Sequence, residues 1–201
     1  SLKESNAPFV ATARVTSEEH SAYVDVDNYY GAQLAMEHLY KLGHRKIAFI
    51  GKPTLRSSLD RLRGYRDTIK KYGLPIFDQW ERISKSSSID GGYITMKEIL
   101  DSGEFPTAVF LTNDIMAMGA IKAIQDHGLR VPEDISVVGF DDVPLAKYTS
   151  PPLTTIHQPA YEKGIEATKL LIEYLATKQM PPEKILDIQL VVRESTAPVK
   201  G

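Results

Sequence analysis

The chain has 201 residues, of which 42% are hydrophobic and 25% are charged, and this balance is typical of a soluble globular protein with a sizeable core. A formal net charge of -2 gives no indication of a nucleic-acid partner, and the lack of cysteine excludes disulfides and zinc–thiolate sites. No apolar run approaches the roughly 20 residues of a membrane helix, and residues 1–6 lack the apolar region of a signal peptide. We therefore expect a cytoplasmic protein with no membrane partner.

Strand-like and helix-like segments alternate along most of the chain, which predicts parallel βαβ units. Residues 9–13 and 23–26 are predicted to be short strands. A helix is predicted to follow Asn28, which can cap it, and to end at Gly43. Its apolar positions recur at helical spacing: Ala32, Ala35, Met36, Leu39 and Leu42.

The next helix is predicted to open near Ser57, because the segment 57–60 has the serine-to-acid spacing of a capping box. Further helices are predicted over about 90–100, 114–127 and 160–177, the last with a buried face formed by Tyr161, Ile165, Thr168, Leu171 and Leu175. The intervening apolar runs are nearly continuous, as expected of parallel strands buried on both faces. Residues 151–160, which begin with Pro-Pro, are interpreted as a crossing between two subdomains.

Polar side chains follow three of the predicted strands at the point where each strand ends. The segment Ser57 to Arg61 follows the first strand, Asn113-Asp114 follows the second, and Asp141-Asp142 follows the third. Ligands of open α/β sheets bind outside the carboxyl ends of the strands. These groups are therefore expected to line a site for a polar small molecule.

Each of these clusters also has a simpler explanation. Asn113-Asp114 begins a helix, so capping explains the pair as well as ligand binding does. Asp141-Asp142 is less well explained by capping, and no third ligand at a recognised spacing accompanies it as a metal site would require. Arg61 is either a surface arginine or a guanidinium aimed into the cleft, where its donors suit hydroxyls, a carboxylate or a phosphate.

No catalytic motif accompanies the polar clusters. The sequence lacks a phosphate-cradling glycine loop, a nucleophile elbow and a His-Glu-x-x-His motif. A polar cleft without a nucleophile–base pair favours binding over chemistry, so we expect no enzyme activity, no catalytic residue, no cofactor and no metal. A hydrolase acting at Asp141-Asp142 is the weaker alternative.

Several motifs, in order over most of the chain, resemble the effector-binding core of lactose/galactose-repressor-type transcription regulators. The densest match is Val131-Pro132-Glu133-Asp134-Ile135-Ser136-Val137-Val138-Gly139-Phe140-Asp141-Asp142. The others are Val26-Asp27-Asn28 with Gly31, the run from Leu42 to Gly51, Arg61 to Tyr65, Pro106 to Phe110, Asn113-Asp114 with Met116, and Pro151 to Ile156 with Gln158.

The resemblance implies an α/β fold of two Rossmann-like lobes with parallel sheets, type I periplasmic-binding-protein-like, with the ligand in the cleft between the lobes. It assigns residues 1–42 and 159–187 to an incomplete N-terminal lobe, and residues 43–158 and 188–201 to the C-terminal lobe. It also implies a homodimer, with Met118 at the interface.

The resemblance further implies effector contacts from Ser57, Arg61, Asn113 and Asp141, with Asp114 and Asp142 in support. The expected effector is a mono- or disaccharide or a sugar phosphate. Many relatives place an aromatic ring about six residues before the position of Tyr93, whereas this chain has Ser87 there. A ring stacked on the ligand at that point is therefore not expected.

The function implied is the ligand-sensing part of a bacterial transcription regulator, expected to act as a repressor, whose lobes change arrangement when an effector binds. Operator DNA would be contacted only through an N-terminal helix-turn-helix headpiece, which these 201 residues lack together with the start of the N-terminal lobe. The alternative is a transport-type periplasmic sugar-binding protein, which shares the fold.

Overall fold

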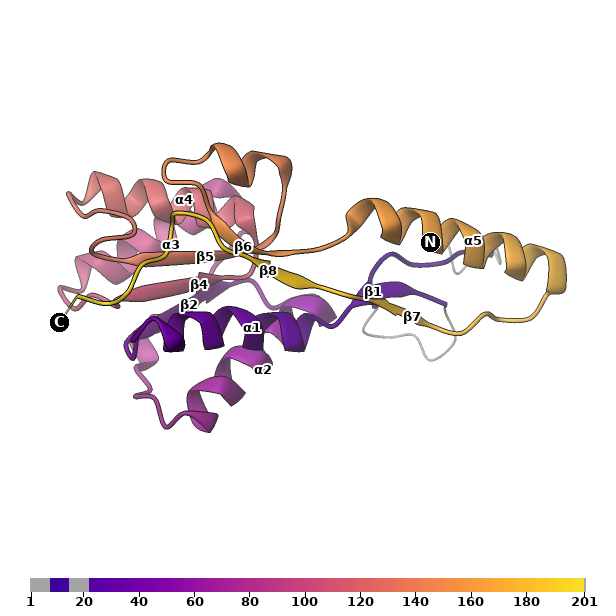
Figure 1. Cartoon of the computed structure of the whole chain (residues 1–201), viewed down its shortest axis with the longest axis horizontal. Helices are drawn as coiled ribbons and strands as arrows, with labels where there is room; N and C mark the ends of the chain where they lie inside the picture. The colour runs from indigo at the N-terminus through magenta and orange to yellow at the C-terminus, as the bar shows by residue number, and fades with distance from the viewer. Residues whose placement is uncertain (1–7, 15–21, 201) are drawn as a thin grey trace.

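The computed structural model in Figure 1 describes residues 8–14 and 22–200. Helices and strands alternate along the chain, as predicted. The strands are β1 (Val24–Val26), β2 (Ile47–Gly51), β3 (Glu81–Ile83), β4 (Ala108–Leu111), β5 (Ser136–Asp141), β6 (Thr154–His157), β7 (Lys184–Leu186) and β8 (Gln189–Val191). The helices are α1 (Asn28–Lys41), α2 (Arg56–Lys71), α3 (Ile89–Asp101), α4 (Asp114–Asp126) and α5 (Ala160–Thr177), with short 3-10 turns at Asp78–Trp80 and Pro144–Tyr148.

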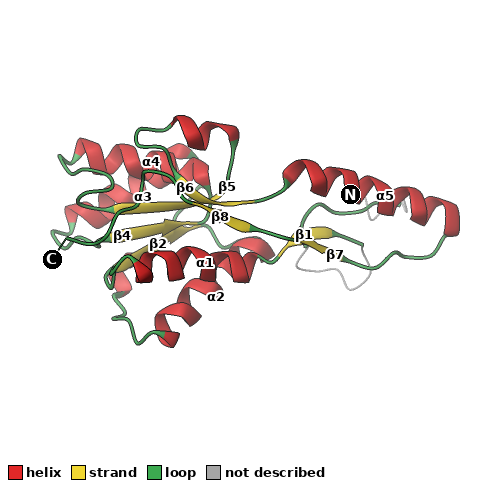
Figure 2. Cartoon of the chain, in the orientation of Figure 1, coloured by secondary structure: helices red, strands yellow, loops and turns green. Residues whose placement is uncertain are grey.

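The larger of two sheets has the strand order β3-β2-β4-β5-β6-β8. Its strands are parallel except β8, which runs antiparallel to β6. Helices α3 and α4 cover one face and α1 and α2 cover the other (Figure 2). All residues of β2 and β4 are buried, which confirms the expectation that their continuous apolar runs are covered on both faces. We call this sheet with α1–α4 the large unit.

The smaller sheet pairs β1 with β7 in parallel, and α5 packs against it through Ala167 and Leu170. We call β1, β7 and α5 the small unit, which extends from one end of the large unit in Figure 1. Helix α5 has the predicted bounds, but its predicted buried face is wrong. Tyr161 is 78% exposed and Leu175 is 46% exposed, because the small sheet covers only the face that carries Ala167 and Leu170.

Helix α1 corrects the domain boundary predicted at residue 42. Its buried residues Ala32, Ala35, Met36 and Leu39 share one core with aromatic residues of the large sheet, among them Phe49. The helix also packs against α2. Residues 28–42 therefore lie in the large unit and not in the predicted N-terminal lobe, because the chain crosses between the units at Asp27, before α1 begins.

Helix ends follow the predicted signals in part. The α1 cap is Asp27, whose side chain accepts a hydrogen bond from the Tyr30 amide at 2.9 Å, and not Asn28. Gly43 ends α1 as predicted, with a φ of 92° that favours glycine. The capping box at Ser57 is wrong, because α2 begins one residue earlier and its cap, Leu55, makes no side-chain hydrogen bond.

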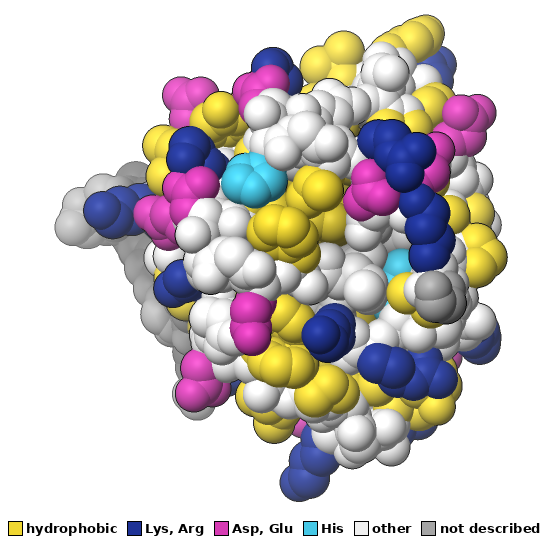
Figure 3. Space-filling model, turned by 90° about the vertical axis from the view of Figure 1, so that its left-hand side faces the viewer, with side chains coloured by type: hydrophobic (Ala, Val, Ile, Leu, Met, Phe, Trp, Pro, Cys, Tyr) yellow, Lys and Arg dark blue, Asp and Glu magenta, His cyan; other side chains and the backbone are white. Residues whose placement is uncertain are grey.

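The surface at the end of the large unit remote from the small unit is mixed. Figure 3 shows basic and acidic side chains scattered around exposed apolar ones on this face. Within residues 8–14 and 22–200, no helix is long and apolar enough to cross a membrane.

Candidate functional site

The carboxyl ends of the parallel strands face the small unit (Figure 1). Arg61 from α2 contacts two of these strand ends, at Thr112 and Asp141. Arg61 is buried, with 7% exposure, so the alternative of a surface arginine is wrong. Its Nε donates to Asn28 Oδ1 at 2.9 Å, and its Nη1 donates to the Thr112 carbonyl oxygen. The guanidinium lies 3.6 Å from the centre of the Phe140 ring. Strand ends and an aromatic face thus fix this cation in one orientation.

Asp141 is the carboxylate that faces Arg61, at 3.3 Å between Oδ1 and Nη1. The same oxygen accepts from Gln158 Nε2 at 2.6 Å. Burial raises the pKa of Asp141, and the charge of Arg61 opposes that rise. The two predicted residues Arg61 and Asp141 therefore meet, and Gln158 joins them from the crossing that follows β6.

The loop after β5 turns sharply, since Asp141 and Asp142 have φ values of 111° and 54°, in the region that favours glycine. Asp142 accepts from Arg193 Nη2 at 2.6 Å and lies 2.9 Å from His157 Nδ1. Burial works against ionisation of Asp142, but the hydrogen bonds from Arg193 and His157 outweigh burial and lower its pKa. Asp142 thereby holds this strained loop against β6 and against the segment that follows β8.

Asp114 lies fully buried beneath the same loop. Its carboxyl group accepts from Thr155 Oγ1 at 2.5 Å and from the Val143 amide at 2.8 Å. Burial raises the pKa of Asp114 to about 7, although both hydrogen bonds act in the opposite sense. Asp114 therefore contacts the loop that orients Asp141.

Asn113 caps α4 through Oδ1, which accepts from the Met116 amide at 2.7 Å. The cap occupies the oxygen, so its Nδ2 donors are the part suited to a ligand. Ser57 is half-buried in the first turn of α2, one turn before Arg61. Met118 is half-buried on α4, outside this group.

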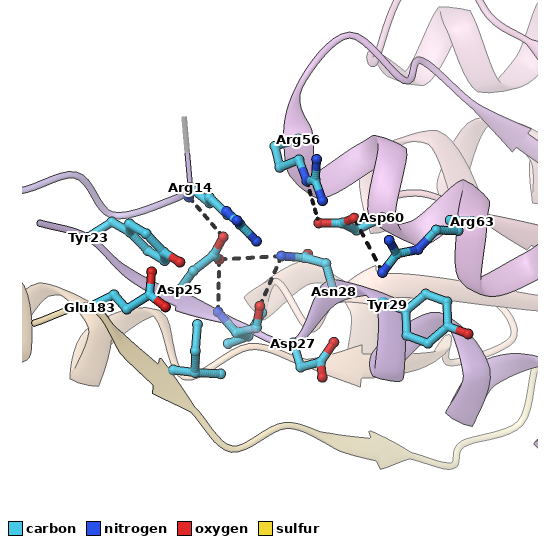
Figure 4. Close-up of a pocket in the computed structure, with 12 residues that line it drawn as sticks. Arg14, Tyr23, Asp25, Asp27, Asn28, Tyr29, Arg56, Asp60, Arg63 and Glu183 are labelled. Carbon is cyan, nitrogen blue, oxygen red and sulfur yellow. Dashed lines mark hydrogen bonds and ion pairs between the residues drawn. The ribbon is translucent and has the colours of Figure 1, made fainter. Parts of the chain in front are cut away.

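A cavity of about 290 Å³ lies between the small unit and α2 (Figure 4). The α2 residues that line it flank Arg61 in the sequence. The small unit lines it with Tyr23, Asp25 and Glu183, and α2 lines it with Arg56, Asp60 and Arg63. None of these six is predicted as a site residue from the sequence. The only available signals in the sequence are the two acidic residues at 25 and 27 and the arginine-rich start of α2, which also fits an exposed helix face.

The side chains of α2 at this cavity are held by each other. Arg56 Nε donates to Asp60 Oδ2 at 3.1 Å, and Arg63 lies 3.9 Å from Asp60 on the other side. The Arg63 guanidinium lies 4.5 Å from the centre of the Tyr29 ring. Within the described part of the chain, no group of three or more His, Cys, Asp or Glu residues could hold a metal ion. The arrangement offers paired donors and acceptors, which suit a ligand with several hydroxyl groups.

Comparison with known proteins identifies the family. Residues 36–196 match the family described as periplasmic binding protein-like domain. The transcriptional regulator CelR of Thermobifida fusca is 35% identical over 198 residues, which cover 96% of this chain and 58% of CelR. The chain spans less than two thirds of the length of the curated relatives it matches, which are named as HTH-type regulators and repressors.

Solved structures agree with the sequence relatives. A structure of a CelR–cellobiose complex has a TM-score of 0.88 at 34% identity and covers 96% of this chain and 60% of that chain. A LacI-family regulator from Enterococcus faecium with bound ribose has a TM-score of 0.88 at 33% identity and covers 99% of this chain and 74% of that chain. The family match and these likenesses give the mostly parallel α/β fold as type I periplasmic-binding-protein-like, and the chain belongs to the LacI family of transcription regulators.

Proposed function

We propose that this chain is the ligand-sensing part of a transcription regulator and binds a sugar between its two units. The observation that carries the proposal is the contact between Arg61 and Asp141 at the carboxyl ends of the parallel strands. A charged donor and a charged acceptor side by side match the vicinal hydroxyl groups of a sugar. The relatives support a regulator over the alternative of a transport protein and over an enzyme acting at Asp141-Asp142.

The neighbouring cavity favours a neutral sugar over a sugar phosphate. Its lining includes three arginines, but it also includes four carboxylates, from Asp25, Asp27, Asp60 and Glu183. A dianionic phosphate would meet these carboxylates at short range, whereas hydroxyl groups can bond to either charge. The solved relatives with bound cellobiose and bound ribose support a mono- or disaccharide.

We assign the two units to the two predicted lobes, with residues 28–42 moved to the C-terminal lobe. The small unit contributes the part of the N-terminal lobe within this chain, at residues 22–27 and 159–187, and the large unit is the C-terminal lobe. Effector contacts come from Ser57, Arg61, Asn113 and Asp141, with Asp114 and Asp142 supporting the loop after β5. Two such chains associate through the helix that carries Met118.

Regulation works by a shift between two arrangements of the lobes. A ligand favours the arrangement to which it binds more tightly. Moving the balance from 1:99 to 99:1 requires about 5.5 kcal/mol of differential binding free energy. In the whole regulator, the lobes set the spacing of headpieces that contact operator DNA.

A thermal-shift screen of the 201-residue chain with cellobiose, ribose and a panel of other sugars tests the proposal. A sugar at 100 times its dissociation constant is expected to stabilise the fold by roughly 2.7 kcal/mol. The Arg61→Ala variant is expected to lose most of this response. Arg130→Ala, which removes an exposed arginine paired with Asp134, is the matched control and should respond as wild type does. An equal response in Arg61→Ala would refute the assignment of the site.

A further inference from the structure

Two ion pairs lie on either side of the crossings between the units. In the large unit, Arg61 faces Asp141 at 3.3 Å. In the small unit, Lys163 from α5 faces Asp25 from β1, with Nζ 3.2 Å from Oδ1. The second pair joins residues 138 positions apart in the chain. Each unit therefore carries one cation and one carboxylate next to the junction.

Asn28, which directly follows the first crossing at Asp27, connects the two pairs. Its Nδ2 lies 3.4 Å from Asp25 Oδ1 in the small unit, and its Oδ1 accepts from Arg61 Nε at 2.9 Å in the large unit. The amide thus offers its donor end to a carboxylate and its acceptor end to a cation. This is the orientation that satisfies both charges.

Gln158, at the second crossing, connects the same pairs from the other side. Its Nε2 donates to Asp141 Oδ1 at 2.6 Å, and its Oε1 accepts from Lys163 Nζ at 3.2 Å. The amide is again oriented by a carboxylate at one end and a cation at the other. The six side chains therefore close a ring in which ion pairs and amides alternate: Asp25, Asn28, Arg61, Asp141, Gln158 and Lys163. We call this set the hinge ring.

The pair in the small unit is shielded from water. The side chains of Lys163 and Asp25 are 12% and 5% exposed. Asp25 also accepts from the backbone amides of Arg14 at 2.9 Å and Val26 at 2.8 Å, so its position is fixed. A buried ammonium group without a partner is costly, which makes Lys163 depend on Asp25 and Gln158.

We propose that Lys163 and Asp25 are positioning residues that hold the two units in the arrangement seen here, and that a ligand acts on this arrangement by opening the hinge ring. A ligand that engages Arg61 and Asp141 removes one partner from Asn28 and one from Gln158. The crossing amides then lose the contacts that link them to Lys163 and Asp25. This inference rests on the proposed function, because it needs a ligand at Arg61 and Asp141.

Spin labels on the two units measure their arrangement directly. The chain has no cysteine, so Glu98→Cys on α3 and Glu173→Cys on α5 give two defined label positions, both exposed. The test variant is Lys163→Met, and the matched control is Lys169→Met, an exposed lysine on the same helix. We expect the distribution of inter-label distances to broaden in Lys163→Met and to stay as in wild type in Lys169→Met.

Lys163→Met leaves the Asp25 carboxylate buried without its cation and can therefore unfold the chain. A second variant separates this effect from a change in the arrangement of the units. Asp25→Asn combined with Lys163→Met removes both charges and keeps the side-chain volumes, and circular dichroism measures whether it is folded. We expect this double variant to show the broadened distribution as well. A distribution identical to that of Lys169→Met in the folded double variant would overturn the proposal.

The Arg61→Met variant removes the cation of the ion pair that is proposed to contact the ligand. It tests whether this pair and the Lys163–Asp25 pair belong to one ring. Because both changes break one ring, Arg61→Met with Lys163→Met should broaden the distribution no further than either change alone. If the double variant broadens the distribution by the sum of the two single effects, the two ion pairs act independently and the proposal is overturned. These measurements use no ligand, so failure of the sugar screen would refute the proposed function without altering the result for the ring.

Discussion

Replacing Asp114 by asparagine is expected to remove a loss of stability that the wild-type chain suffers as the pH rises. Asp114 is fully buried, and its carboxyl group contacts only protein donors, from Thr155 and Val143, in the described structure. Burial raises its pKa to about 7, from 3.8 for an accessible aspartate. The folded chain therefore keeps this proton at pH values where the unfolded chain has released it.

The direction and size of the change in the free energy of unfolding follow from this difference in pKa. The folded state binds more protons than the unfolded state between pH 3.8 and about 7, so the free energy of unfolding falls as the pH rises through this window. A difference of about three pKa units corresponds to roughly 4 kcal/mol in all, at about 1.4 kcal/mol for each unit. Roughly 3 kcal/mol of this is lost between pH 5 and pH 8.

Asparagine matches the protonated carboxyl group in shape and hydrogen bonding. Its amide can donate to Thr155 Oγ1 while its oxygen accepts from the Val143 amide, and it carries no charge at any pH. The free energy of unfolding of the variant should therefore rise by about 3 kcal/mol relative to that of wild type between pH 5 and pH 8. Urea denaturation of both chains at pH 5, 6, 7 and 8 measures this difference.

The matched control is Asp187→Asn, which changes an exposed carboxylate between β7 and β8. Its free energy of unfolding should follow that of wild type at every pH. If the difference between Asp114→Asn and wild type is constant from pH 5 to pH 8, Asp114 is ionised in the folded chain. The account of a protonated acid beneath the loop after β5 would then be wrong.

Substitutions at three further positions test the site, the packing and the dimer interface. Asn113→Ala is expected to lower the free energy of unfolding by about 1 kcal/mol, because the α4 cap is lost. Asn113→Ser should keep the cap, so its free energy of unfolding in urea should stay near that of wild type, while its thermal response to a bound sugar should weaken. Gly119→Ala should destabilise the chain despite the better helix propensity of alanine, because its Cβ would lie 2.0 Å from the Ile89 carbonyl oxygen on α3, and an unchanged melting temperature would contradict this packing. Met118→Glu should shift sedimentation toward the monomer, and unchanged association would contradict the predicted dimer interface.

The helices and strands are largely predictable, because hydrophobic spacing and glycine stops act through residues that are close in the sequence. Continuous apolar runs give β2 and β4, and helical spacing with glycine stops gives the bounds of α1 and α4 closely. The predicted buried face of α5 fails because burial depends on what packs against a helix. Periodicity alone identifies an apolar face but not its partner.

Position at the ends of the strands, and not residue type, makes part of the candidate site predictable. Arg61 and Asp141 stand out because they follow strands of a parallel sheet. Asp25 and Lys163 do not, since 138 residues separate them and each alone resembles an ordinary charged residue in a strand or a helix. Asn28 is predicted as a helix cap, yet its side chain connects the two ion pairs and Asp27 forms the cap.

The energetics of buried charge explain why the junction carries so much of it. Replacing a buried ion pair with apolar residues of similar volume is often neutral or stabilising, whereas removing one partner is strongly destabilising. Stability alone therefore gives little reason for Arg61 to lie against Phe140 or for Lys163 to lie beside Asp25. A junction that must keep one arrangement and still yield to a ligand has such a reason, because hydrogen bonds between charges are directional and can be exchanged for those of a polar ligand, while an apolar contact cannot.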